Sequence, residues 1–460
     1  APTRERYWKP RKVAVVVRQL LVDTTPLKVP EFRRLWQANI VTVIGAQLNI
    51  IAVPAHIYAL TGSSAYVGLA SLCGFVPLVV FGLYGGSLAD SMDRRTLLHI
   101  TTTGMILSAA GFWAFAAVGG GSVWPLLALF AVQQGFFAVN QPTRVAIIAT
   151  LVGRQQIAAA TSLNMTVQQA GAIIGPVLGG MLIPILGFSW LYFLDFVALF
   201  ATLYAVHRLP TLPPRTTGEG QPAKAGIASV IDGFRFLLTQ PIILMTFAID
   251  LIAMVFGSPR ALIPQMSAED FGERASGGIM YALLFAALPV GAVLGGLFSG
   301  VVTKIERRGL GVSCFVALWG VAILVMGLAV SAANGTVGLW AAVALLAFAA
   351  GGAADMFSAV LRSTMLQEAA TDEVRGRVQS VFFVVVAGGP RIADGLHGWA
   401  GSHYSAGTVT AAGGGLVIIG TIVMLLVVPR FLTWTPAAAL DNIEAEHHGD
   451  AAQGIQKEGS

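Results

Sequence analysis

Charged residues are scarce in this chain. Asp, Glu, Lys and Arg make up 11% of its 460 residues, whereas hydrophobic residues make up 55%. Soluble domains carry roughly 25% charged residues, so a water-soluble globule of this length has too little polar surface to cover so much apolar area. A lipid bilayer accepts that area, and the composition therefore predicts an integral membrane protein.

Cysteine is nearly missing, and so are recognisable catalytic or metal-binding patterns. Cys73 and Cys314 lie alone in separate apolar stretches, and we interpret both as packing residues. The sequence contains no HExxH, GxSxG, paired-cysteine or phosphate-loop pattern, and its 7 histidines are dispersed. These absences argue against an enzyme, and we expect no metal ion and no cofactor, with a proton gradient as the energy source.

Long apolar runs are abundant. Runs of about 20 residues span a bilayer as helices, and we predict an all-α membrane protein with about twelve such helices. No signal peptide is visible, because the N-terminal stretch VAVVV is short and is flanked by basic residues on both sides. The expected spans are 34–60, 65–89, 96–118, 122–151, 157–184, 187–207, 241–265, 277–302, 309–332, 336–367, 376–401 and 407–430.

Lysine and arginine are placed asymmetrically along the chain. They crowd the N-terminal tail and the turns that follow even-numbered spans, while opposite turns such as TGSS at 61–64 are nearly uncharged. By the positive-inside rule, both termini and the even-numbered turns are cytoplasmic. The basic residues are spread over alternate turns instead of forming one patch, so we expect no nucleic-acid partner.

A linker divides the chain near its middle. Residues 209–226 are rich in Pro, Gly and polar residues, and a short stretch after them has apolar residues at helical spacing, as in an interfacial amphipathic helix. Two six-helix halves suggest a transporter with its substrate site between them. The expected regions are a cytoplasmic basic tail (1–33), an N-terminal bundle (34–207), a cytoplasmic linker with the amphipathic helix (208–240), a C-terminal bundle (241–430) and a disordered cytoplasmic tail (431–460).

Two motifs resemble signatures of the major facilitator superfamily. GGSLADSMDRRTL resembles the loop 2–3 signature G-x-L-A-D-R-x-G-R-K-x-x-L, although Ser91 and Asp93 replace the usual Arg and Gly. The stretch 171–180 resembles the helix 5 antiporter motif G-x-x-x-G-P-x-x-G-G, which is typical of exporters. The matching residues are Gly86, Leu88, Ala89, Asp90, Arg94, Arg95 and Leu97 in the first motif, and Gly171, Gly175, Pro176, Gly179 and Gly180 in the second.

Further stretches, among them LTGSSAYVGL, FGSPRALIP and GGPRIADGLHG, look most like the enterobactin-exporter-like branch of that superfamily. The likeness covers nearly all of residues 30–430. One feature departs from the pattern, because Ala131 stands where exporters often have an Arg in helix 4.

The resemblance implies roles for both motifs. The charged turn with Gly86, Asp90, Arg94 and Arg95 would pack against the start of helix 11, where Arg375 or Arg377 adds charge, when the cytoplasmic side is closed. We predict that these contacts form a conformational latch, helped by the attraction of a carboxylate to a helix N-terminus. We expect the glycine motif to pack closely against the eighth span, where Gly291, Gly295 and Gly296 also cluster, and to seal the outer half.

Ionisable residues inside the spans point to function, because they are costly in a bilayer. We predict a proton carrier among Asp250, Asp394 and Asp355. Arg391 and Asp394 are three residues apart, on one helical face, so we expect them to pair. The pair is either a coupling switch that protonation of Asp394 breaks or a static structural contact. We interpret Asp195 as structural, and we expect Arg144, Arg260 and Arg362 to snorkel from helix ends.

Polar residues in several spans predict a substrate cavity between the halves. Some of the amides are expected instead to bond neighbouring helices. The candidates for the cavity wall are Gln47, Asn49, Gln133, Gln134, Asn140, Gln141, Asn164, Gln168, Gln169 and Arg260.

The sequence therefore favours a proton-coupled exporter of an organic small molecule in a bacterial cytoplasmic membrane, and the resemblance favours a siderophore as cargo. A multidrug/proton antiporter is the alternative, and a nutrient importer or facilitator is the alternative of another class. We expect the small molecule and the lipid bilayer as partners and a monomer as the working unit.

Overall fold

The computed structural model describes residues 23–212, 227–302, 304–369 and 372–435, and these parts of the chain are helical without strands. Ten helices are long and apolar enough to cross a bilayer. One of them, α6 (Ile157–His207), turns sharply at Gly187, where φ is 76°, and so supplies two spans. With α14 (Asp372–Gly401), whose first turns are rich in charge, the described residues contain the predicted twelve spans.

The first half of the chain forms the spans that precede the linker. Its helices begin and end where the local sequence favours a boundary: Pro30 opens the first of them, Ser63 caps the second, and Asp93 caps the third by accepting a hydrogen bond from the Thr96 N–H. The helices are α2 (Pro30–Thr61), α3 (Ser64–Ser91), α4 (Arg94–Ala117), α5 (Val123–Val152) and α6, with short 3-10 turns η1 (Thr25–Lys28) and η2 (Arg154–Gln156).

The second half follows the linker. Its first span is broken, because α8 gives way after Gly257 to a series of short 3-10, α and π turns. The elements are α7 (Ile227–Thr239), α8 (Pro241–Gly257), η3 (Arg260–Leu262), α9 (Ile263–Gln265), η4 (Met266–Asp270), α10 (Ile279–Leu297), α11 (Ser299–Val302), α12 (Arg308–Ala332), α13 (Leu339–Ala369), α14, α15 (Ala406–Val427) and η5 (Pro429–Thr433).

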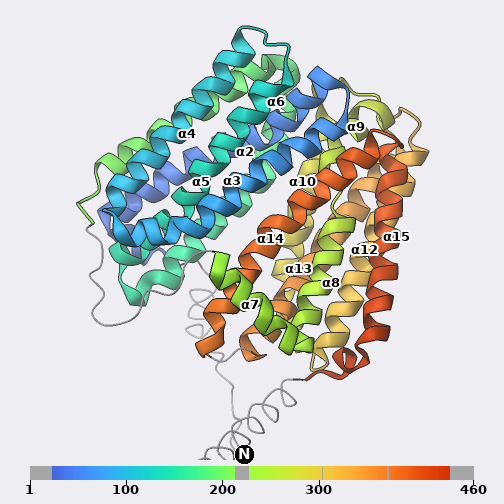
Figure 1. Ribbon diagram of the computed structural model, residues 1–460. Coiled ribbons are helices and arrows are strands. Elements are labelled where there is room, and N and C mark those ends of the chain that lie inside the picture. The colour runs from blue at the N-terminus through green and yellow to red at the C-terminus, as the bar shows by residue number, and fades with distance from the viewer. Residues whose placement is uncertain (1–22, 213–226, 303, 370–371, 436–460) are drawn as a thin grey trace, which may run out of the picture.

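Two pairs of helices join the halves: α3 packs along α14, and the first part of α6 packs against α10. Figure 1 shows the halves converging near α9 and lying farther apart near α7. We call the end with the start of α3 and the end of α14 the closed end, and the end with His207 and α7 the linker end. At the closed end a Cβ added to Gly68 would lie 2.3 Å from the Asp394 carbonyl oxygen, so only glycine permits this contact between backbones.

The glycine motif of α6 packs mainly within its own half. A Cβ added at Gly171 would lie 2.3 Å from Val43 Cγ1, and one added at Gly175 would lie 2.2 Å from Gln47 Cβ, both on α2. Gly179 likewise faces α2, at Ile51. Residues four apart share one face of a helix, so these three glycines turn together towards α2.

The expected packing of this motif against α10 is therefore found for one of its four glycines and is wrong for the other three. Only Gly180, one position further round the helix, faces α10, where an added Cβ would lie 2.4 Å from Ala282 Cβ. Gly291 and Gly295 face α13 instead, at Ala349 and Ala353. At the closed end, α6 and α10 therefore pack closely through Gly180 of α6 and Ala282 of α10.

Helix α7 has the expected amphipathic character. Leu237 is buried, in a cluster with Ile243 and Phe247 that anchors the helix to the second half. Phe234 and Leu238 remain exposed, and Figure 1 shows α7 beside α14. An exposed apolar face on such a helix fits the lipid interface.

Candidate functional site

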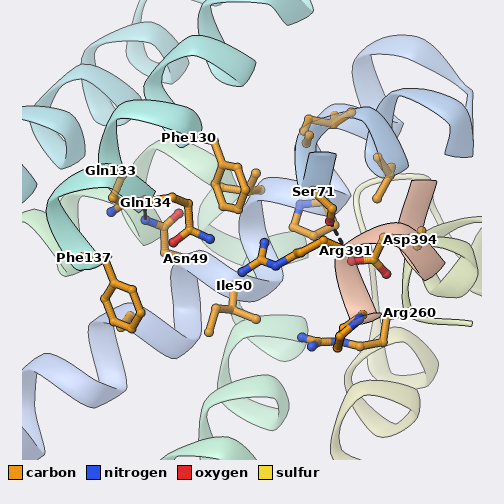
Figure 2. Close-up of a pocket in the computed structure, with 18 of the residues that line it drawn as sticks. Asn49, Ile50, Ser71, Phe130, Gln133, Gln134, Phe137, Arg260, Arg391 and Asp394 are labelled. Carbon is orange, nitrogen blue, oxygen red and sulfur yellow. Dashed lines mark hydrogen bonds between the residues drawn. The ribbon is translucent and has the colours of Figure 1, made fainter. Parts of the chain in front are cut away.

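A cavity of about 280 Å³ lies between the two halves. The first half contributes side chains of α2, α3, α4 and α5, and the second half contributes side chains of η3, α10 and α14 (Figure 2). Its polar and charged lining residues are Asn49, Ser71, Gln133, Gln134, Arg260, Arg391 and Asp394.

Arg391 and Asp394 lie on the same face of α14, but they do not form the predicted ion pair. Asp394 accepts a hydrogen bond of 2.7 Å from the Ser71 hydroxyl of α3. Arg391 extends across the cavity towards Gln134 of α5 (Figure 2). With the Gln134 amide turned so that its oxygen faces the guanidinium, that oxygen accepts hydrogen bonds of 2.8 and 3.2 Å. Each residue therefore bridges the two halves separately, and the expected switch between them has no direct contact to break.

The lining combines positive charge with aromatic surface. Arg260 and Arg391 are two cations, and Asp394 is the one acid among the lining residues. The Arg391 guanidinium lies 6.0 Å from the ring centroid of Phe130, within the range of a cation–π contact. Such a cavity is suited to an organic anion with flat or apolar groups.

Four of the polar residues proposed for the cavity wall lie in its lining: Asn49, Gln133, Gln134 and Arg260. Arg260 is exposed to this cavity instead of snorkelling away from it.

The other six lie elsewhere. Gln47 packs against Gly175, and Gln141 is partly buried outside the lining. Asn140 bonds to Thr101 and Thr102 of α4, and Asn164 accepts a hydrogen bond from Asn39. These two amides join helices. The exposed pair Gln168 and Gln169 also lies outside the lining.

A second ionic cluster lies inside the second half. Arg362 of α13 contacts Asp250 of α8, with 2.8 Å between Nη2 and Oδ1, and lies 3.7 Å from Asp355. Arg362 and Asp250 are both buried, so the interpretation of Arg362 as a snorkelling residue is wrong. Sequence position along α13 could not show that an acid of another helix neutralises it.

The charged turn between α3 and α4 is anchored to its own half. Asp93 accepts a hydrogen bond from the Leu212 N–H, Arg94 donates one to Thr150, and Arg95 donates one to the His207 carbonyl at 2.8 Å. The structure does not describe the side chains at the other predicted latch positions, which are Gly86, Asp90, Arg375 and Arg377. The latch stays a prediction.

The closed end contains a hydrogen-bond network that the sequence did not reveal. Gln265 joins both halves, because its amide oxygen accepts from Ser64 at 2.8 Å and its amide nitrogen donates to the Gly401 carbonyl at 3.1 Å. Glu269 accepts from the Gln265 amide at 3.0 Å and from the Tyr58 hydroxyl at 2.5 Å. In the sequence, the acidic stretch SAED at 267–270 marks the position of this network, but the partners lie on other helices.

Comparisons with known proteins agree with this arrangement. Residues 22–449 match the family described as transmembrane secretion effector. The enterobactin exporter EntS of Shigella boydii serotype 18 is 29% identical over 411 residues, which cover 87% of this chain and 92% of the exporter. EntS of Escherichia coli O127:H6 has the same identity and coverage.

Solved structures with the same fold are more distant in sequence. The nucleoside transporter NupG superposes with a TM-score of 0.67 at 13% identity, covering 88% of this chain and 100% of NupG. A bacterial homologue of the iron transporter ferroportin in an inward-facing state also gives 0.67, at 12% identity, with 88% and 99% covered. At these identities the structures show the fold alone.

Proposed function

Because the chain belongs to the transmembrane secretion effector family of the major facilitator superfamily, we propose that it exports an organic anion, a siderophore, in exchange for protons. The chain is a multi-pass transporter of the bacterial inner membrane. If the positive-inside prediction holds, the linker end is cytoplasmic, and the cavity is closed towards the periplasm in this conformation. Cargo would enter from the cytoplasm and leave after the closed end opens.

The observation that carries the proposal is the pair of arginines in the cavity. Siderophores bind ferric iron through acidic oxygen groups, and a guanidinium recognises such groups through charge-assisted hydrogen bonds. Phe130 and Phe137 of α5 add surface for aromatic rings. The similarity to enterobactin exporters points to the same cargo class.

The proposal is tested by comparing the culture medium of a strain that lacks the gene with that of its parent under iron limitation. We expect one iron-chelating compound to fall sharply in the medium and to accumulate in the cells. Unchanged chelators with raised drug accumulation would favour a multidrug antiporter. Uptake of a nutrient into proteoliposomes that contain the protein, and not into liposomes without it, would favour an importer.

Replacing Arg391 by Gln should weaken the cargo site without breaking the fold, because the amide keeps a polar contact but loses the charge. Hydrogen bonds to charged groups contribute about 1.5–3 kcal/mol, so we expect the KM for the exported chelator to rise roughly 10- to 100-fold. Transport of the chelator into inverted membrane vesicles gives the measurement, with Arg208→Gln, outside the cavity, as the matched control. A KM equal to that of the control would show that Arg391 does not contact cargo.

Protons are proposed to bind at the acids of the second half. Asp250 and Asp355 share one arginine, Arg362, so the cluster holds one carboxylate more than it has cations. That excess favours binding of a proton in a desolvated site. Asp394, bonded to Ser71 across the halves, remains a second carrier candidate whose protonation would alter that contact.

Asp90→Asn tests the proposed latch at the linker end. The neutral amide removes the carboxylate that would face a helix N-terminus, an interaction of about 0.3–2 kcal/mol. We expect transport to slow by several-fold while expression and thermal stability stay unchanged. Ser87→Ala in the same turn is the control, and a turnover number equal to that of the control would refute the latch.

A further inference from the structure

Asp195 is a buried carboxylate with no cationic partner in the described part of the chain. It lies in the second part of α6, and only 2% of its surface is exposed. The Asn49 amide nitrogen donates a hydrogen bond of 3.0 Å to its Oδ2. An ionised carboxylate is costly to bury unless a cation neutralises it, whereas a protonated one is neutral.

The titratable groups of the surrounding helices are engaged elsewhere. On α2, His56 contacts the Tyr192 hydroxyl at 3.2 Å. Tyr192 lies one helical turn from Asp195, on the side of the closed end. On α5, Arg144 bonds to Asn39 and Thr202, and Thr202 is two turns from Asp195 towards the linker end.

The charged and titratable groups of α4 lie farther away. His99 packs against the ring of His207, and Arg95 bonds to the carbonyl of the same residue, while Arg94 bonds to Thr150 of α5. His207 is twelve residues beyond Asp195, about 18 Å along a helix. Asp195 is therefore isolated from charge on every element packed against it.

Asn49 connects this carboxyl group to the cavity. Its amide nitrogen donates to Asp195 Oδ2 and, at 3.3 Å, to Oε1 of Gln133. Both amide hydrogens are thus used, and the amide oxygen is buried without a partner. Asn49 and Gln133 both line the cavity (Figure 2).

We propose that Asp195 is a proton-binding site in the N-terminal half, and that its occupancy sets the orientation of the Asn49 and Gln133 amides. Its use in transport rests on the proposed function, whereas proton binding itself does not.

The two protonation states favour opposite amide orientations, because protonation adds an O–H donor to a group whose other oxygen still accepts. The ionised carboxylate only accepts hydrogen bonds, so it holds the Asn49 nitrogen towards it, as the structure shows. When one proton adds to the carboxylate, the new O–H donates and requires an acceptor. Turning the Asn49 amide by half a rotation supplies its oxygen, which has two lone pairs.

The turned Asn49 oxygen would then face the Gln133 oxygen, and neither of these two acceptors carries a hydrogen to donate. Gln133 must turn in the same way and present its amide nitrogen to Asn49. One proton is taken up, one O–H bond forms on Asp195, and no other covalent bond changes; only the hydrogen bonds of the two amides are exchanged. The cavity wall thereby exchanges donor and acceptor positions in response to a proton bound at Asp195, which lies outside the cavity lining.

Infrared difference spectra of the purified protein in lipid, between alkaline and acidic buffer, test this relay without cargo. We expect a band of a protonated carboxylic acid together with changes in side-chain amide bands, which isotope-labelled asparagine assigns. Asp195→Asn should lose the acid band that belongs to Asp195, and the amide changes with it, while the acid bands of the second half remain. Asp250→Asn, in the other half, should leave the amide changes intact.

Two further variants keep the proposal open to refutation if Asp195→Asn does not fold. Asn49→Leu should shift the Asp195 acid band, because the carboxyl loses its one partner, and Gln133→Leu should keep the acid band but change the Asn49 bands. An unmoved acid band in Asn49→Leu, or amide changes that persist in Asp195→Asn, would overturn the proposal. Loss of chelator export alone would bear on the proposed function and not on this site.

Discussion

Gly68→Leu should abolish transport and leave the cavity open at the end that is closed in the structure. Even a Cβ at this position would lie 2.3 Å from the Asp394 carbonyl oxygen, which belongs to the backbone of the opposite half. Overpacking a tight contact costs about 1–3 kcal/mol or more. Such an energy shifts the equilibrium between the conformation that is closed at this end and the one that is open there by roughly 5- to 150-fold. The clash is absent when the two halves separate at this end, so the variant favours the open conformation.

Thiol labelling in intact cells measures this shift. Ile50 lines the cavity, so Ile50→Cys, with Cys73 and Cys314 replaced by Ser, reports its accessibility. An impermeant maleimide should label the Gly68→Leu variant rapidly and its parent slowly. Gly415→Leu is the matched control, because an added Cβ there meets nothing within 4 Å. Wild-type transport in Gly68→Leu would show that this contact need not form.

Arg362→Gln should both destabilise the protein and uncouple transport from protons. The change leaves Asp250, which is buried, without the cation that lies 2.8 Å from it. Removing one partner of a buried ion pair costs about 3–5 kcal/mol, so the unfolding temperature should fall by several degrees. The surviving transporter should bind cargo but no longer exchange it for protons.

The double variant Arg362→Gln/Asp250→Asn separates these two effects. It removes the uncompensated charge, so we expect most of the thermal stability to return. Proton exchange should not return, because the carboxylate that would bind the proton is gone. An unfolding temperature of Arg362→Gln equal to that of the wild type would contradict the buried pair, and normal coupling in the double variant would exclude Asp250 as a carrier.

Most of the twelve spans could be predicted from the sequence because they are apolar runs long enough to cross a bilayer, α14 with its charged first turns being the exception. Even the division of α6 was visible, since the expected spans end at 184 and resume at 187, where Gly187 breaks the helix. The Pro-, Gly- and polar-rich composition of residues 209–226 also predicted the division into two halves. These features depend on local composition and on motifs, which a single sequence carries.

The polar contacts could not be predicted in the same way, because they depend on neighbouring helices. Spacing along α14 placed Arg391 and Asp394 on one face, but Gln134 and Ser71 of the first half provide their partners. The position of Arg362 near the end of its span predicted snorkelling, but in the structure Asp250 of α8 lies beside it. In each case the deciding atom belongs to a helix remote in sequence.

The most direct test of the account is a proton measurement in inverted membrane vesicles whose interior is acidified by respiration. Adding the exported chelator should raise the internal pH in vesicles with the wild-type protein, because each cargo molecule that enters drives protons out. Vesicles with Arg362→Gln should show no pH change. Accumulation of the chelator in wild-type vesicles without any rise in internal pH would contradict proton-coupled export.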